Sequence, residues 1–468
     1  MTDTGSKALV PQGPTTVAPV SRLAERTLAE RAEREKEALV AARTLLVGPG
    51  GYATISLAVE AARDGDTILV RPGRYEESVV VEGKTITIRG DGERDAIVVG
   101  SDRGPAFTLV DTRSTLTGLT ITGGEFSSWL ELGAALLVTG GSPQLSGLLV
   151  AHSGAPQLDG MRATNGRSVG VRFEGGAAGA IEHSQIDGND LGISVLDGAS
   201  PRIEENEVWG HRWSAIEISD AGTKPLVRAN RVHDGKGSGF VVRAGASPRI
   251  ENNDAWANGG YGIEIRDAGT DPLVRVNRVH HGEMFGILMG DGASPRVEEN
   301  EIWANAMSGI EISDAGTDPL VRANRIHHGE ETGILVYAGA SPRIEENDVW
   351  ANAHTGISIQ AAGTDPLVRG NRVHHGAMFG ILVCDGASPR VEENEVWANA
   401  EAGIWISGAG ASPVISGNTV RDGLDDGILV SDVASPTIAG NTITGNAREA
   451  MRVGKSATPM IGPNVVSS

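Results

Sequence analysis

A short segment in which apolar and polar residues alternate recurs along most of the chain. One copy is Gly262-Ile-Glu-Ile265 and the next is Gly286-Ile-Leu-Met289. Alternation with a period of two is typical of a β-strand with one face turned inward. No stretch of about 10–12 residues with a helical period fits between the copies, so the pattern excludes a helical solenoid.

A second segment shows the length of the repeat. Ser200-Pro-Arg-Ile-Glu-Glu-Asn-Glu-Val-Trp209 returns three times, and once more loosely from Ser247, with prolines 47 residues apart. A related segment that begins at Pro225 recurs midway between these copies, so the unit is alternately 24 and 23 residues long. At the corners between strands, Pro fixes φ and Gly permits a positive φ.

The repeat predicts an all-β fold. Three short strands per coil, stacked in parallel, make a single-stranded right-handed parallel β-helix with coils of about 23 residues. We predict that it spans residues 45–468, with a capping helix over 55–62 and the most regular coils over 200–445. At a spacing of about 4.8 Å, roughly 16 coils would extend about 75 Å.

An asparagine stands five residues after each proline, at twelve positions in the same phase. In coils stacked about 4.8 Å apart, such amides can donate hydrogen bonds to one another. A satisfied buried amide adds roughly 1 kcal/mol, whereas an orphaned one costs more. We therefore predict an internal ladder with a structural role, formed by Asn206, Asn230, Asn253, Asn277, Asn300, Asn324, Asn347, Asn371, Asn394, Asn418, Asn441 and Asn464.

The beginning of the repeat region completes a resemblance to a known family. Tyr52-Ala-Thr-Ile-Ser-Leu-Ala-Val59 leads into Gly65-Asp-Thr-Ile-Leu-Val70 and Pro72-Gly-Arg-Tyr-Glu-Glu77. With the Gly-Ile and Ser-Pro-x-Ile repeats, these residues resemble the pectin-lyase-like right-handed β-helix superfamily, specifically its NosD-like repeat proteins. The resemblance implies the fold and a cap over the first coil, but it specifies activity weakly. The paired aspartates and glutamine motifs of pectinesterases have no counterpart here.

Composition narrows the function classes. Forty Lys and Arg against 60 Asp and Glu give a net charge of −20, which argues against a nucleic-acid partner because phosphate recognition needs surplus basic residues. The single cysteine, Cys384, excludes an internal disulfide, and no apolar run is long enough to span a membrane. Residues 1–20 lack the apolar core of a secretory signal, so we expect a disordered tail in a cytoplasmic protein. The Ala/Glu/Arg-rich residues 21–44 predict a helical arm.

One outward row combines tryptophan with histidine. The two alternate over nine coils, eight residues after successive prolines, and the row holds five of the eight tryptophans. Because alternation turns Val208 inward, it turns this row outward. The row is either a stabilising stack of rings or a rail that binds sugar rings or the apolar surface of a protein. The binding candidates are Trp209, His233, Trp256, His280, Trp303, His327, Trp350, His374 and Trp397.

A second outward row follows the Gly-Ile strands and is rich in carboxylates. Paired carboxylates can act as general acid and base on a sugar. Three identical pairs, however, offer no single environment that pushes two pKa values apart. The catalytic candidates are Glu217, Asp220, Glu264, Asp267, Glu311 and Asp314. Four residues interrupt the pattern of this row and are candidates for determining specificity: Arg243, Arg266, Tyr337 and Cys384.

Adjacent histidines such as His280 and His281 raise the question of a metal. Neighbouring residues on a strand point to opposite faces, and equivalent histidines lie two coils apart, so we expect neither a metal nor a cofactor. Because duplication copies a ladder easily and a unique active site poorly, we predict a non-enzymatic binding or scaffold protein for a glycan or protein partner. The alternatives are a carbohydrate-active enzyme (polysaccharide lyase, glycoside hydrolase or epimerase) and an acidic DNA mimic. We also expect a homodimer through the C-terminal coil or the N-terminal helix.

Overall fold

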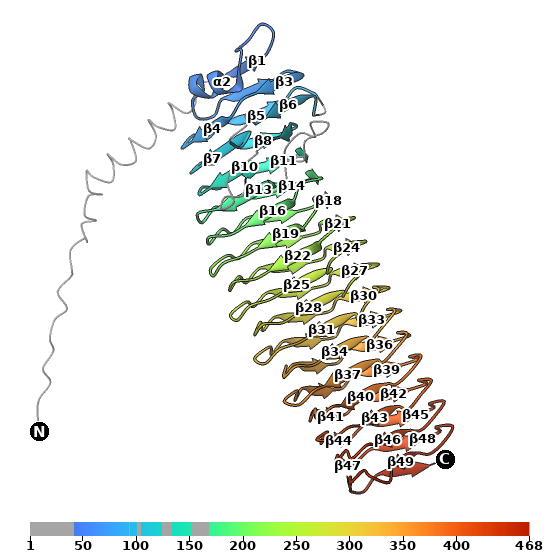
Figure 1. The fold of residues 1–468 in the computed structure, drawn as a ribbon. Coiled ribbons are helices and arrows are strands. Elements are labelled where there is room, and N and C mark those ends of the chain that lie inside the picture. Colours follow the sequence, from blue (N-terminus) through green and yellow to red (C-terminus); the bar gives the residue numbers. More distant parts are fainter. Residues whose placement is uncertain (1–41, 93, 101–103, 124–132, 152–167, 468) are drawn as a thin grey trace, which may run out of the picture. The chain divides into compact units, whose positions relative to one another are not determined.

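The structure is a computed structural model that describes residues 42–92, 94–100, 104–123, 133–151 and 168–467 (Figure 1). Contacts divide the chain into residues 1–43 and residues 44–468, and every described helix and strand lies in the second unit. The disordered tail predicted over residues 1–20 lies outside the described residues, as does nearly all of the helical arm predicted over 21–44. In the part of the chain that is described, no helix is long and apolar enough to cross a membrane.

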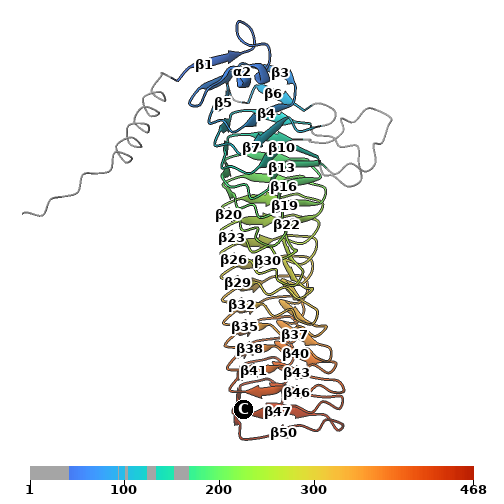
Figure 2. The ribbon, with the colours of Figure 1, turned by 90° about the vertical axis from the view of Figure 1, so that its left-hand side faces the viewer.

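Each complete coil of the second unit contributes one strand to each of three parallel sheets (Figures 1 and 2). Sheets A and C hold 18 and 16 strands, and sheet B lies between them in chain order. A coil in the middle consists of β17 (Arg202–Glu204) in sheet A, β18 (Glu207–Trp209) in sheet B and β19 (Ser214–Ile218) in sheet C. The sheets run from β1 (Thr44–Val47) to β50 (Met460–Ile461), from β3 (Gly73–Glu76) to β51 (Val465–Ser467), and from β4 (Val79–Glu82) to β49 (Met451–Val453).

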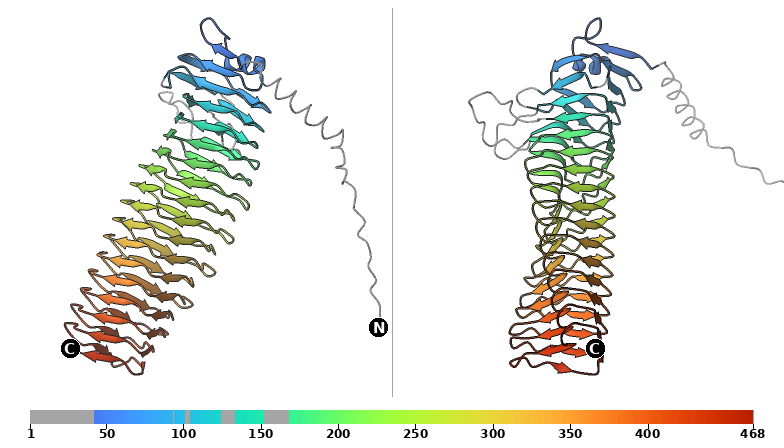
Figure 3. Two further views of the ribbon diagram at one scale, coloured as in Figure 1. Left: turned by 180° about the vertical axis from the view of Figure 1, so that it is seen from behind. Right: turned by 90° about the vertical axis from the view of Figure 1, so that its right-hand side faces the viewer.

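Strands in successive coils pair in register, so equivalent residues form columns along the stack (Figure 3). The pairing of β18 with β21 (Arg231–His233) places Val208 opposite Val232 and Trp209 opposite His233. The prediction of an all-β right-handed parallel β-helix with coils of about 23 residues is confirmed, and about 17 turns are present where roughly 16 were expected.

The core is a continuous column of aliphatic side chains. Val208, Val232, Ile263 and Ile265 are fully buried, and one apolar cluster extends through the coils. The glycine of the Gly-Ile segments is required by close packing. A Cβ atom at Gly356 would lie 2.3 Å from Cγ1 of Val373 and 2.7 Å from the carbonyl oxygen of Gly380, nearer than real side chains approach.

The predicted asparagine ladder is confirmed. The backbone N–H and the side-chain amide of Asn253 both donate to Oδ1 of Asn277, at 2.9 and 3.0 Å. The same amide donates to the carbonyl of Val227 at 3.0 Å, and Oδ1 of Asn253 accepts from the backbone and side chain of Asn230. Within the stack, each ladder asparagine therefore joins three coils and has its polar groups paired, whereas Asn464 at the end binds only the preceding coil and its own.

A second set of buried asparagines lies between sheets B and C on alternate coils. Oδ1 of Asn258 accepts from the backbone N–H of Gly235 at 3.1 Å, and its amide donates to the carbonyl of Val232 at 3.2 Å. Four equivalents bind in the same way. Asn305, Asn352 and Asn399 are also buried, and Asn446 is partly buried. One coil carries His211 at this position, fully buried.

The first coil is covered by α2 (Ile55–Ala61), which confirms the capping helix predicted over 55–62. Its apolar residues Ile55, Ala58 and Val59 are buried against the strands. Glu77 accepts hydrogen bonds from the first backbone N–H groups of the helix, at 2.8 and 2.9 Å, and satisfies donors that a helix leaves unpaired. At the other end, strands β50 and β51 expose apolar side chains such as Met460 and Val465. Homodimer formation through this coil or the N-terminal helix stays a prediction.

One corner residue is poorly suited to its backbone. The residue between sheets A and B has a φ near +55° in most coils, and Val276 adopts it with a φ of 56° and an exposed side chain. A β-branched residue is strained in this conformation, whereas asparagine, which stands at the equivalent position 252, tolerates it. We expect Val276→Asn to raise the free energy of unfolding by about 1 kcal/mol, measured by urea denaturation. Val414→Asn, at an exposed valine inside a strand, should give no gain; an equal gain there would contradict the strain argument.

Candidate functional site

The tryptophans and histidines predicted to align form one column on sheet B, from β18 to β42 (Glu395–Trp397). Their rings are nearly parallel from coil to coil. Each histidine ring centroid lies 4.0–4.2 Å from that of the tryptophan in the next coil. Each tryptophan lies 6.0–6.1 Å from the histidine in the next coil. The rings therefore stack face to face along the axis of the helix.

Neighbouring coils cover the faces of these rings. The Arg278 guanidinium lies 5.3 Å from the ring centroid of Trp303, beside the stacked His280, and the equivalent arginines repeat this contact. A sugar ring stacks on an open aromatic face, whereas this column presents mainly edges. Its stacking stabilises adjacent coils by about 0.5–1.5 kcal/mol per pair. Its role in binding stays a prediction.

The histidine pairs beside this column do not follow the expected alternation. His281, His328 and His375 each have a φ of 54°, a left-handed conformation that turns the chain at the end of the strand. The two Nδ1 atoms lie 2.8 Å apart in the pairs beginning at His280 and His327, and 2.7 Å apart in the third. The expectation that adjacent histidines point to opposite faces is wrong, because alternation holds only within extended strands. The described residues contain no group of three or more His, Cys, Asp or Glu that could hold a metal.

The three glutamates of the second row form part of a column on the outer face of sheet C. They belong to β19, β25 (Ile263–Ile265) and β31 (Ile310–Ile312). Their surroundings differ, contrary to the expectation of three identical pairs. Glu217 forms an ion pair with Arg243. Glu264 forms an ion pair with Arg266 at 2.8 Å and accepts a hydrogen bond from Ser238 Oγ at 3.1 Å.

Glu311 differs from the other two glutamates. It is 4% exposed, it has no ion-pair partner among the described residues, and Oε1 accepts a hydrogen bond from the Tyr337 hydroxyl. Burial raises the pKa of Glu311, and burial together with this hydrogen bond raises the pKa of Tyr337 to about 12. Within the described chain, Oε2 of Glu311 and the buried hydroxyl of Ser308 have no hydrogen-bond partner. A buried carboxyl with an orphaned oxygen and a shifted pKa is typical of a functional site.

The aspartates of the predicted pairs bind the corners between sheets C and A. Oδ2 of Asp267 accepts from the backbone N–H of Ala244 at 3.0 Å, and Oδ2 of Asp314 accepts from that of Asp291 at 3.3 Å. Asp220 makes the same contact one repeat earlier. All three have a φ between 73° and 76°, so these residues close left-handed corners.

The residues that interrupt the pattern have distinct contacts. Arg243 and Arg266 bind the glutamates, and Arg266 also pairs with Asp291 at 2.9 Å. Burial and the neighbouring Asp385 raise the pKa of Cys384 to about 12, which leaves its thiol protonated and unreactive at neutral pH.

Two aromatic pairs on sheet C were missed by the sequence reasoning. Tyr261 and Phe285 stack with their centroids 5.9 Å apart, and Phe379 lies 4.5 Å from Trp405. All four side chains are partly exposed. Tyr261, Phe285 and Phe379 each precede the glycine of a Gly-Ile segment, where most other coils carry Ser, Thr or Ala. This departure from the repeat is the sequence feature that could have identified the pairs.

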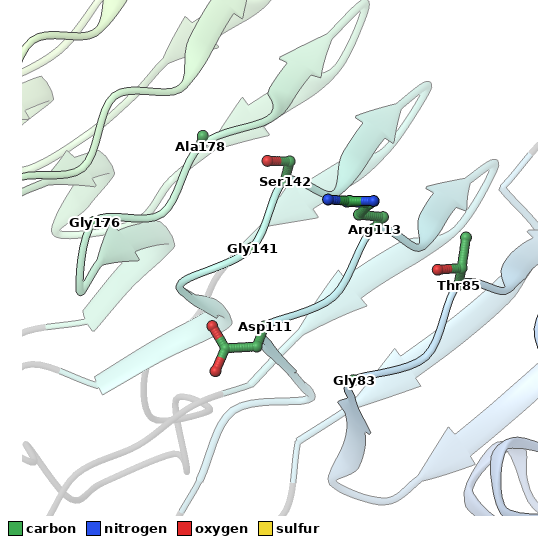
Figure 4. A pocket seen from close by; sticks show the side chains of 8 residues that line it. All are labelled: Gly83, Thr85, Asp111, Arg113, Gly141, Ser142, Gly176 and Ala178. Carbon is green, nitrogen blue, oxygen red and sulfur yellow. The ribbon is translucent and has the colours of Figure 1, made fainter. Parts of the chain in front are cut away.

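A cavity of about 470 Å³ lies at the corners of four coils near α2 (Figure 4). Small residues such as Gly141 and Gly176 leave it open, and Asp111 and Arg113 are its charged lining residues. It contains none of the predicted site residues and lies several coils from Glu311, so it does not extend the sheet C site.

Comparisons with known proteins agree with this architecture. A family model described as right handed beta helix region matches residues 109–279, 268–372 and 344–466. A search of curated proteins found no match. Three similar solved structures show a likeness of fold alone. A mutant of the periplasmic alginate epimerase AlgG is 13% identical, and the match covers 85% of this chain and 77% of that chain with a TM-score of 0.37. The A-module of the Azotobacter vinelandii mannuronan C-5 epimerase AlgE4 is 15% identical (88% and 94% covered, TM-score 0.33), and the catalytic domain of a GH87 alpha-1,3-glucanase in complex with nigerose is 11% identical (91% and 68% covered, TM-score 0.37).

Proposed function

The chain belongs to the right-handed β-helix family, whose fold hosts many activities, so we propose a function from the site and not from the fold. The proposed function is that of a carbohydrate-active enzyme, namely a glycoside hydrolase with its acid–base groups on sheet C. The observation that supports this proposal is the unequal setting of Glu264 and Glu311. Glu264 is paired with Arg266, whereas burial raises the pKa of Glu311 and favours its protonated form. Cleavage of a glycosidic bond needs one carboxylic acid and one carboxylate.

The spacing of the two groups favours hydrolysis with inversion. Glu264 and Glu311 stand on alternate coils, which places their strands about 9.6 Å apart at a spacing of 4.8 Å per coil. This strand spacing is close to the upper end of the roughly 6.5–9.5 Å between the carboxyl groups of inverting enzymes, which leaves room for a water molecule, and far from the roughly 5–5.5 Å of retaining enzymes. Glu311 donates its proton to the leaving oxygen as the C–O bond breaks. Glu264 accepts a proton from the water that forms the new C–O bond.

Neighbouring side chains suit these roles. The Tyr337 hydroxyl donates to Oε1 of Glu311, so the acidic proton belongs on Oε2, the buried oxygen that has no partner among the described residues. A rotation of the side chain has to expose Oε2 before it can reach the leaving oxygen. Tyr261 shares a coil with Glu264, and the coil of Phe285 lies between those of the two glutamates. Their partly exposed rings offer surfaces for adjoining sugar units.

The test compares two glutamates of the same column. We expect Glu311→Gln to lower kcat on a cleaved polysaccharide about 10²–10⁴-fold, because amide nitrogen cannot supply the proton. Glu217→Gln, at the equivalent position paired with Arg243, should retain activity. Reducing ends released from neutral and acidic polysaccharides give the rates, and NMR of the first product gives its anomer. Equal losses in both variants, or an unsaturated product typical of β-elimination, would contradict the assignment.

A binding protein without turnover is the second candidate. The aromatic pairs on sheet C favour it, since they provide contact area whether or not a bond is cleaved. Saccharide binding by the intact chain, with no cleavage of any bound polysaccharide, would select this function. The acidic DNA mimic is less favoured, because Glu204 pairs with Arg228 at 3.0 Å and Glu207 with Arg231 at 3.1 Å, which neutralises the carboxylate rows.

A further inference from the structure

Three histidine pairs bring two imidazole nitrogens together on the outer side of sheet B. Each pair joins a ring of the Trp/His column to an exposed ring at the left-handed corner that follows it. The Nδ1 atoms are 2.8, 2.8 and 2.7 Å apart in the pairs His280–His281, His327–His328 and His374–His375. The same arrangement thus recurs on alternate coils, independently of the sheet C site.

Hydrogen bonds fix the tautomer of the stacked histidine in two of the pairs. Nε2 of His280 lies 3.0 Å from Oδ1 of Asp254, and Arg278 pairs with Oδ2 of the same carboxylate at 3.2 Å. Since an ionised carboxylate only accepts, Nε2 carries the proton, and Nδ1 presents a lone pair that accepts the Nδ1–H of His281 in the metal-free chain. His374 and Asp348 repeat this contact at 3.0 Å. A histidine that donates its other N–H to a carboxylate is the usual arrangement of a metal ligand.

We propose that each histidine pair chelates one divalent transition-metal ion through its two Nδ1 atoms. The ion replaces the proton between the two nitrogens, and the exposed ring then carries its proton on Nε2. Metal–nitrogen bonds of about 2.0–2.1 Å across a 2.8 Å separation give an N–metal–N angle of about 86°. That angle suits the square-planar or octahedral coordination of Ni²⁺ or Cu²⁺, whereas tetrahedral Zn²⁺ needs a wider angle. The described residues supply no third ligand, so water or a ligand from outside the described residues completes the coordination.

The three sites should differ in strength. In the middle pair, Nε2 of His327 lies 3.6 Å from Glu301, too far for a hydrogen bond. Its tautomer is therefore less well fixed, and we expect this site to bind about 10–100-fold more weakly than the other two, the usual effect of losing such a partner.

The experiment titrates Ni²⁺ alone into the untagged full chain by calorimetry. We expect two tight equivalents and one weaker equivalent, tighter for Ni²⁺ than for Zn²⁺. The triple variant His281→Ala, His328→Ala, His375→Ala removes only exposed rings and should abolish these equivalents, with an unchanged circular-dichroism spectrum. His354→Ala, at an exposed unpaired histidine, is the control and should leave them intact.

Asp254→Asn tests the role of the carboxylate without removing a ligand. We expect one of the two tight equivalents to weaken about 10–100-fold. Ni²⁺ binding that survives the triple variant, for example at the N-terminal amine, would overturn the proposal. Equal affinity for Zn²⁺ and Ni²⁺ would overturn the assigned geometry.

Discussion

Asn253→Ala is expected to lower the free energy of unfolding by about 3–4 kcal/mol. Removal of the amide leaves the buried N–H of Asn230 without its acceptor and takes a donor from the carbonyl of Val227. Each orphaned buried group costs about 1–3 kcal/mol, which exceeds the net value of the bonds themselves. The loss should appear as a lower midpoint of equilibrium unfolding in urea.

The preceding residue provides a matched control. Asn252 is exposed and has a φ of 55°, and alanine occupies the equivalent corner at positions 229 and 323 with a similar φ. Asn252→Ala should therefore change stability by less than about 1 kcal/mol. Similar losses in both variants would show that the ladder contributes no more than an ordinary corner residue.

The fold and its columns were predictable because the repeat is translational. Once a unit of 23 or 24 residues is identified, every equivalent position must stack, and Asn253 must lie beside Asn277. The identity of the buried residues then follows from alternation alone. The same reasoning placed the tryptophans and histidines in one column.

Alternation could not predict what happens at the corners or how the rings are oriented. The left-handed φ of His281 ends the alternation, so its ring turns to the side of His280. The ring planes of the column depend on side-chain torsions, which the period of two does not constrain. The rings stack upon one another, as the first of the two interpretations of the row has it, and only the structure shows this orientation.

The candidate site was only partly predictable for a related reason. The sequence identifies the glutamates but does not distinguish them, because their own segments are nearly identical. Their surroundings are set by residues on neighbouring strands about 25 positions away, such as Arg243 and Tyr337. These residues were noticed as interruptions of the pattern. Which glutamate each one contacts required the three-dimensional register.

His211 should make the stability of the chain sensitive to acid. It is fully buried where other coils carry asparagine, and its Nδ1 accepts from the N–H of Asn189 at 3.1 Å while Nε2 donates to the carbonyl of Ile186 at 3.1 Å. Burial lowers the pKa of His211 from 6.5 to about 4. The folded state disfavours protonation because the charged imidazolium would be removed from water, and the carbonyl oxygens of Asn189 and Ile186, 3.3 and 3.1 Å from the ring nitrogens, offset this cost only in part.

The sign of the effect follows from proton linkage. Between pH 6.5 and about 4 the unfolded chain binds more protons than the folded one, so stability falls as the pH falls through this window. At pH 4 the loss from this residue is about 3 kcal/mol relative to neutral pH. His211→Asn supplies the same acceptor and donor without a titrating group, as Asn258 does in the next repeat.

Urea unfolding of both proteins from pH 7 to pH 4 measures this effect. We expect the stability difference in favour of His211→Asn to grow by about 3 kcal/mol as the pH falls. His354→Asn removes an exposed imidazole and is the control, and the stability difference should grow much less there than at His211. Parallel slopes for the wild-type chain and His211→Asn would mean that this coil opens or hydrates before the imidazole is protonated. An asparagine amide fills the same position in five later coils. A steeper dependence of stability on pH in the wild-type chain than in His211→Asn would therefore show that this one imidazole causes the acid sensitivity.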